Sequence, residues 1–217
     1  MKQPLPPTPV PARRRPQQSR ARQTSLALQH AFVRLLPERG FDALTIREIV
    51  DVAGTGLGSF YEYFANKDDL ARVAVHLRSK TLLEAMRHAV TAQTGQPLAQ
   101  VVRAILRALA DAHASHPLEW GAHYALERQV SDPDAYARMY ERFVKEWTIA
   151  LVSAAEGPSA GPELDEVART CHTIAYGLFA HAHIRAYAGA ALVPDAQVVA
   201  HQAELALLGY LTQLQAP

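Results

Sequence analysis

Apolar residues recur at helical spacing from Arg20 to the C-terminus, and no segment alternates apolar and polar residues as a strand would. Prolines stand at or near the expected first positions of five later helices, where a missing backbone N–H costs nothing. The pattern predicts an all-α fold of about nine helices. We expect them at 20–38, from 45, 57–64, 67–92, 97–115, 117–129, 132–156, 162–188 and 194–214.

Charge divides the chain unevenly. Residues 1–47 hold nine Lys and Arg against two Asp and Glu, whereas the remainder holds thirteen against nineteen. Residues 1–19 are rich in proline, include Arg13-Arg14-Arg15 and lack apolar periodicity, which is typical of a flexible tail. This tail is either a solvated terminus or a basic arm that touches DNA. We therefore expect three parts: the tail 1–19, a DNA-binding domain 20–66 and a larger helical domain 67–217.

Several classes of protein are disfavoured. The single cysteine, Cys171, rules out a disulfide framework, and no apolar run is long enough to span a membrane or to serve as a secretory signal, which predicts a cytoplasmic protein. Cys171 and His172 are helix neighbours whose side chains diverge by about 100°, so they cannot form a catalytic pair. The pairs His113/His116 and His181/His183 have no carboxylate or cysteine that completes a ligand set. We expect no enzyme, metal or cofactor.

Two short amphipathic helices form the most informative segment, TIREIVDVAGTGLGSFYEYFANK, from Thr45 to Lys67. Thr45 and Glu48 have the spacing of a capping box, and Gly54 can take the left-handed conformation that reverses the chain. This pattern is typical of a helix-turn-helix, with a generic helical hairpin as the alternative. The apolar stripes are Ile46, Ile49, Val50 and Ala53, then Leu57, Phe60, Tyr61 and Phe64, of which we assign Ile46, Ile49, Phe60 and Phe64 to the core.

The segment from Arg20 to Leu70 resembles the N-terminal DNA-binding domain of the tetracycline-repressor (TetR) family. The matching residues are Ala31, Leu35 and Leu36, Gly40-Phe41, Thr45-Ile46-Arg47-Glu48-Ile49, Ala53-Gly54, Gly58-Ser59-Phe60-Tyr61, Phe64, Lys67 and Leu70. The resemblance implies a helical ligand-binding and dimerisation domain after residue 66. The sequence departs from the family pattern at Thr55 and Gly56 in the turn, at Leu57, at Tyr63 where a histidine is common, and at Pro37, which we expect to shorten or kink the first helix.

The resemblance and the chemistry of the side chains together predict the contacts with DNA. Five residues are suited to phosphate oxygens: Thr45, Arg47, Tyr61, Tyr63 and Lys67. A base edge is the alternative contact for Arg47, and core packing is the alternative for Tyr61. Thr55 or Gly56 could cap the recognition helix, Gly56 only with its backbone, and Gly58 permits close approach to the groove. The turn and the start of this helix hold the four residues nearest the base edges: Thr55, Leu57, Gly58 and Ser59.

Aromatic residues are spread through the second domain at helical spacing, where core packing is the alternative to a ligand pocket. By resemblance, the middle helices hold an effector pocket, for which we select Trp120, Tyr124, Tyr140, Trp147, His172 and Tyr176. The last two helices are rich in small residues, and the resemblance implies that they form a four-helix dimer interface. The expected surface residues include Ala175, Gly177, Ala180, Ala182, Ala186, Ala188 and Leu205.

These expectations converge on a ligand-responsive homodimer that binds double-stranded DNA and regulates transcription. The resemblance implies a repressor that a small apolar or aromatic effector releases from a palindromic operator. The alternative is a helical small-molecule-binding protein whose helix-turn-helix is vestigial and has no operator. Salt-dependent binding to duplex DNA distinguishes the two.

Overall fold

The computed structural model describes residues 16–155, 157 and 162–214. Within these residues all regular secondary structure is helical, which confirms the predicted all-α class. The tail prediction falls mostly on residues 1–15, which lie outside the described residues. The helices are α1 (Pro16–Arg39), α2 (Ile46–Ala53), α3 (Leu57–Tyr63), α4 (Lys67–Ala92), α5 (Leu98–Ala114), α6 (Pro117–Val130), α7 (Pro133–Ser153), α8 (Pro162–Tyr187) and α9 (Ala196–Leu214).

Local sequence signals set most helix ends. Glu48 N donates to the Thr45 hydroxyl over 3.2 Å and Thr45 N donates to the Glu48 carboxylate over 2.9 Å, so the predicted capping box is present. Gly54 ends α2 with φ of +66°, the left-handed conformation expected for it. Asn66 caps α4 by accepting from Asp69 N over 2.8 Å. Pro37 does not shorten α1, because the helix continues to Arg39.

The apolar side chains form two separate cores that meet at α4 and α6. The smaller core joins α1, α2, α3, the first part of α4 and one face of α6, and it includes Leu28, Phe32, Ile49 and Phe60, all fully buried. The larger core fills the body formed by α4 to α9, around residues such as Trp147. Helices α4 and α6 both supply buried residues to the two cores, α6 with Ala122 and Leu126 on one side and Trp120 and Tyr124 on the other, so both helices link the domains.

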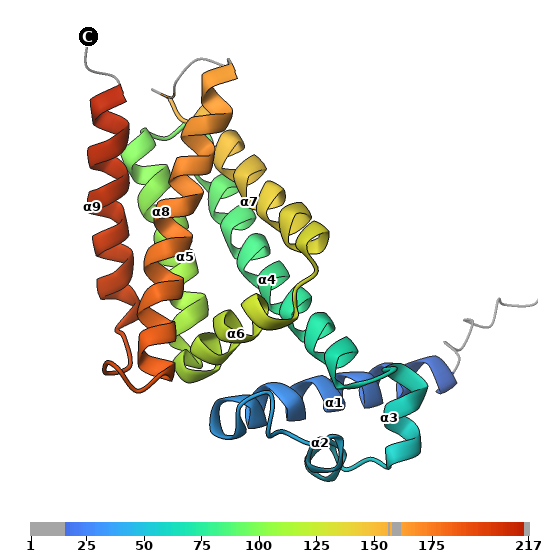
Figure 1. Cartoon of the computed structure of the whole chain (residues 1–217). Coiled ribbons are helices and arrows are strands. Elements are labelled where there is room, and N and C mark those ends of the chain that lie inside the picture. The colour runs from blue at the N-terminus through green and yellow to red at the C-terminus, as the bar shows by residue number, and fades with distance from the viewer. Residues whose placement is uncertain (1–15, 156, 158–161, 215–217) are drawn as a thin grey trace, which may run out of the picture.

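Figure 1 shows how the helices are arranged. Helices α1, α2 and α3 form the base, α4 rises from this base into the body, and α8 and α9 stand side by side at one edge of the body. Helix α6 crosses between the base and α8, and it passes α8 so closely that a Cβ atom on Gly121 would lie 2.5 Å from the His183 carbonyl oxygen. Among the described residues, no helix has the length and apolar character needed to cross a membrane.

Candidate DNA interface and ligand cavity

One face of α3 is exposed to solvent, although the opposite face is packed in the small core. Leu57 is 41% exposed and Tyr61 is 59% exposed, whereas Phe60 is fully buried in the small core. A Cβ atom on Gly58 would meet no atom within 4 Å, so the helix face beside it is open. The core alternative for Tyr61 is therefore wrong, although its ring meets that of Phe60 edge to face, with 5.4 Å between the ring centroids. One side of α3 anchors the helix, and the other is free to meet a partner.

Neighbouring residues extend this open face, but Tyr63 leans inward. Arg47 is exposed on α2, and Ser59 is half-buried on α3. Tyr63 is half-buried and packs against the small core, so only part of its side chain faces solvent. The side chains of Leu57, Ser59 and Tyr61, together with that of Arg47, are therefore the predicted DNA-contact residues that the fold leaves most available.

The side chain of Thr55 does not cap the start of α3. Gly56, not Thr55, is the N-cap of α3, and no side chain accepts a hydrogen bond from the first turn of that helix. The Thr55 hydroxyl oxygen is buried and has no hydrogen-bond partner among the described residues. Of the two caps expected from the sequence, Gly56 therefore takes the position with its backbone, and the Thr55 hydroxyl is turned inward.

Lys67 and Thr45 use their donors inside the protein. The Lys67 ammonium group donates to the carbonyl oxygens of Phe41, Asp42 and Leu44 over 2.6, 3.3 and 2.7 Å, which occupies its three N–H bonds. The Thr45 hydroxyl donates to Glu48 over 2.7 Å. A phosphate would have to displace these acceptors, so the geometry assigns Lys67 first to holding the α1–α2 loop on α4.

Three small cavities lie in a row inside the body. The outer one, about 70 Å³, lies between α4, the α6–α7 turn and α7, and the middle and inner ones, about 30 Å³ each, continue inward between α4, α7 and α8. The outer and middle cavities share Ser79, Glu127, Tyr136 and Met139, and the middle and inner cavities share Leu82, Tyr124, Phe143, His172 and Tyr176. The row forms one potential path from the surface toward the core.

Five of the six residues selected from the sequence for an effector pocket line these cavities: Tyr124, Tyr140, Trp147, His172 and Tyr176. The sixth residue, Trp120, is buried away from them. Its indole N–H donates to the Ala112 carbonyl over 2.9 Å, and the guanidinium of Arg78 lies 4.3 Å over its ring. Trp120 therefore belongs to the packing between α4, α5 and α6 and does not line the cavities.

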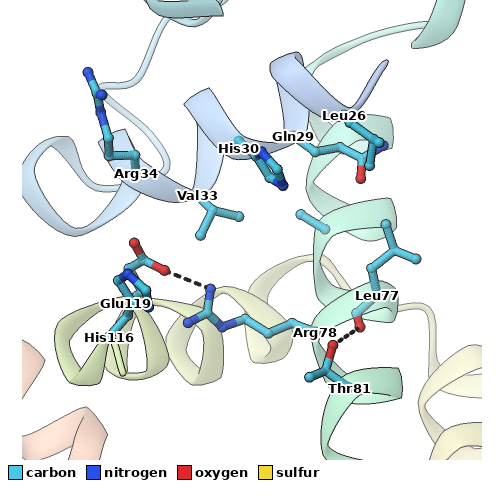
Figure 2. Close-up of a pocket in the computed structure, with 11 residues that line it drawn as sticks. Leu26, Gln29, His30, Val33, Arg34, Leu77, Arg78, Thr81, His116 and Glu119 are labelled. Atoms are coloured by element: carbon cyan, nitrogen blue, oxygen red, sulfur yellow. Dashed lines mark hydrogen bonds and ion pairs between the residues drawn. The ribbon is translucent and has the colours of Figure 1, made fainter. Parts of the chain in front are cut away.

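A separate open cleft of about 590 Å³ lies between the two domains (Figure 2). His30 and Val33 of α1 form one wall, and the residues opposite come from α4 and α6. Arg78 of α4 crosses the floor and pairs with Glu119 of α6 over 2.9 Å. The Arg78–Glu119 pair ties α4 to α6 at this cleft, and beside it α1 packs on Ala122 and Leu126 of α6.

The sequence of the base matches a known family model. Residues 30–74, which cover α2, α3 and parts of α1 and α4, match the model described as bacterial regulatory proteins, tetR family. This segment of the chain, the helix-turn-helix base, is therefore similar to the tetR family of bacterial regulators. No curated protein sequence matches the chain at a significant level.

Solved structures show that the TetR-family fold extends over both domains. A TetR family transcription regulator from Marinobacter aquaeolei VT8 matches with a TM-score of 0.63 and 18% identity, covering 86% of this chain and 96% of that one. FadR from Bacillus subtilis, in complex with stearoyl-CoA, matches with 0.66 and 14%, covering 84% and 96%. NemR from E. coli matches with 0.60 and 16%, covering 83% and 94%. At these identities the likeness establishes the fold.

Within this TetR-like fold, Glu127 is a candidate site residue that was not predicted from the sequence. Its carboxylate is 7% exposed, accepts a hydrogen bond from the Tyr176 hydroxyl over 2.6 Å and lies 3.5 Å from the Ser79 hydroxyl. The signal was present: Trp120, Tyr124 and Glu127 fall at i, i+4 and i+7, which places the carboxylate on the buried stripe of α6. Burial raises the pKa of Glu127, while the hydrogen bonds from Tyr176 and Ser79 oppose this effect.

Proposed function

We propose that this TetR-like protein is a homodimeric repressor of transcription that a small-molecule effector releases from a palindromic operator. The observation that carries the proposal is the exposed face of α3. A helix that buries Phe60 but leaves Leu57 and Tyr61 in solvent, with no side chain at Gly58, has the shape of a helix presented to a major groove. The match of residues 30–74 to the family model supports this role.

The proposed contacts divide into two groups. Arg47 and Tyr61, with part of Tyr63, bind phosphates, which position the protein without determining sequence preference. Leu57 and Ser59 lie in the first turn of α3, the end of a recognition helix that meets base edges. Leu57 has no polar group, so its contact is a thymine methyl group.

Dimerisation through α8 and α9 supplies the second recognition helix. Leu205 is 62% exposed on α9, and Cβ atoms on Gly177 and Gly209 would meet nothing within 4 Å, so these positions leave the outer face open and smooth. Two predicted surface residues, Ala175 and Ala180, are instead buried against the body at 2% and 1% exposure. A two-fold pair of such faces would place the recognition helices on one operator with matching symmetry.

Helix α4 is the element that would transmit ligand binding to the DNA interface. Ser79 of α4 borders the middle cavity, and Lys67 at the start of α4 holds the α1–α2 loop about 18 Å away along the helix axis. The cavities are small, so a ligand must push α4, α7 and α8 apart. FadR, a structural neighbour, has been solved with stearoyl-CoA, which supports a body of this fold that opens for a ligand.

The test is a mobility-shift assay on the DNA that flanks the gene of this protein, repeated with candidate ligands. The proposal predicts a retarded duplex that a ligand releases, and binding that weakens as salt rises. Failure to bind any flanking duplex even at low salt would favour the alternative of a helical ligand-binding protein with a vestigial helix-turn-helix. The occupied donors of Thr45 and Lys67 are the observation that favours this alternative.

A further inference from the structure

Glu127 occupies the junction between the outer and middle cavities. Tyr176 donates to one carboxylate oxygen over 2.6 Å, and Ser79 approaches the other at 3.5 Å. Each oxygen of a carboxylate can accept about two hydrogen bonds, so these two contacts leave capacity on both. The carboxylate is therefore held in place with room for a further donor.

No positive group balances this carboxylate in the two inward cavities. Among the described residues that line the middle and inner cavities, Glu127 is the only acidic residue, and there is no lysine or arginine. His113, His123 and His172 do not supply the charge, because burial lowers their pKa to about 3, about 3 and about 4. The outer cavity differs because its lining includes both basic and acidic side chains, among them Arg72, His76 and Asp132.

Aromatic rings surround the space next to Glu127. The ring of His172 lies 4.9 Å from that of Tyr140 and 5.1 Å from that of Phe143, and Tyr124 meets Tyr176 edge to face at 5.6 Å. The faces of such rings attract cations, and the attraction grows when water is excluded. Beyond them, the inner cavity is lined by apolar groups that include Trp147 and Phe179.

We propose that the effector is an elongated amphiphilic amine, with its ammonium group at Glu127 and its apolar body in the inner cavity. This inference takes its regulatory meaning from the proposed function, although the binding itself does not depend on DNA. The present cavities hold space for about one or two water molecules each, so the amine must widen them. A ligand of the opposite charge would meet a buried carboxylate in two cavities whose linings contain no lysine or arginine.

The test uses three probes of equal chain length that differ only in the charge of the head group: octylammonium, octanol and octanoate. Isothermal calorimetry of the full chain without DNA measures their affinities at pH 7. We expect octylammonium to bind at least about tenfold more tightly than octanol, and octanoate to bind least. In Glu127→Gln the affinity for octylammonium should fall about tenfold, and that for octanol should stay within about twofold.

Two further variants serve as a control and as an independent test of the proposed site. Glu146→Gln removes a buried carboxylate that pairs with Arg87 and does not line any of the three cavities, and it should leave octylammonium binding unchanged. Tyr140→Leu keeps an apolar side chain but removes one ring, and it should weaken octylammonium binding several-fold without affecting octanol. This variant decides the question if Glu127→Gln fails to show a normal thermal melt.

The proposal is overturned if octanol or octanoate binds as tightly as octylammonium, or if Glu127→Gln and Tyr140→Leu bind the ammonium like the wild type. The outcome is independent of the mobility-shift assay. Amine binding without any operator would refute the repressor and keep this site, whereas an operator released only by neutral or anionic ligands would refute this site and keep the repressor.

Discussion

The hydroxyl group of Tyr124 donates a hydrogen bond to Nε2 of His113 over 2.8 Å, and Nδ1 of the same ring donates to the Leu109 carbonyl over 2.6 Å. A carbonyl oxygen only accepts, so Nδ1 carries a proton, and the ring is neutral because burial lowers the pKa of His113 to about 3. His183 repeats the arrangement with the Phe179 carbonyl over 2.8 Å. The body therefore contains imidazoles that folding keeps uncharged.

This arrangement predicts that acid destabilises the protein between pH 7 and pH 5.5. Unfolded histidines protonate near pH 6.5, whereas burial keeps the pKa of His113 and His123 at about 3 and that of His172 at about 4. The unfolded chain thus binds more protons, and each ring should lower the free energy of unfolding by about 1 kcal/mol over this interval. Urea denaturation at the two pH values measures the change.

Glu127 provides the control for this prediction. Burial raises its pKa in the folded state, so protonation of this group favours the folded state as the pH falls and offsets part of the loss. Glu127→Gln should therefore make the acid loss steeper. Stability that rises between pH 7 and pH 5.5 in the wild type would contradict the assignment of neutral buried histidines.

Lys67→Met should lower the free energy of unfolding by roughly 2 kcal/mol, because three loop carbonyls lose their charged donor. Arg47→Ala is the matched change at an exposed cation, and it should alter stability by less than about 0.5 kcal/mol. Arg47→Ala should instead weaken all duplexes alike and reduce the salt slope by about one per protomer. A Lys67→Met protein that melts normally but binds every duplex weakly would restore Lys67 as a phosphate contact.

Leu57→Ala should fold normally, because the side chain is 41% exposed. On the preferred operator it should lose about 1–3 kcal/mol of binding free energy and relax the preference at one base pair per half-site. Selection of binding sites from a random duplex pool, together with a thermal melt, checks both. If Leu57→Ala melts at a lower temperature and selects the same sites as the wild type, the base contact is not made by Leu57, and Ser59 becomes the leading candidate.

Gly121→Ala should destabilise the body by about 3 kcal/mol, since the new methyl group would lie 2.5 Å from the His183 carbonyl oxygen and 2.6 Å from Cβ of Tyr187. Gly58→Ala has open space and should raise helix stability by about 0.5–1 kcal/mol. Denaturant midpoints compare the two. Equal effects would mean that α6 and α8 separate easily.

Leu205→Glu should convert the proposed dimer to a monomer, because it places a charge on the exposed face of α9. Leu118→Glu changes a leucine on α6 that is 48% exposed and should leave the dimer intact. Light scattering at micromolar concentration reports the mass. A wild-type monomer that still binds an operator would exclude the α8–α9 dimer.

Features that depend on neighbours in sequence were predictable. The Thr45–Glu48 capping box, the left-handed Gly54 and the Asn66 cap all lie within four residues of the groups they serve. The core positions Ile49 and Phe60 followed from helical spacing in the same way. Helix ends and apolar faces are local properties, so a single sequence reveals them.

Features that depend on distant partners were missed. The acceptors of Lys67 lie 23 to 26 residues earlier in the chain, so its spacing suggested a phosphate contact. Trp120 shares an aromatic pattern with residues that line the cavities, but only the packing of Arg78 over it shows that it faces elsewhere. Glu127 reaches Tyr176 of α8, which is 49 residues away. Such pairings are decided by tertiary packing.

The three hydrogen bonds of Lys67 also determine how the base can move. They fasten the loop before α2 to the first residue of α4, and the small core fastens α3 to the same helix. A rotation of α4 would therefore move α2 and α3 with it as one rigid body. A small displacement of α4 beside Glu127 would then change the distance between the recognition helices of the two protomers in the proposed dimer.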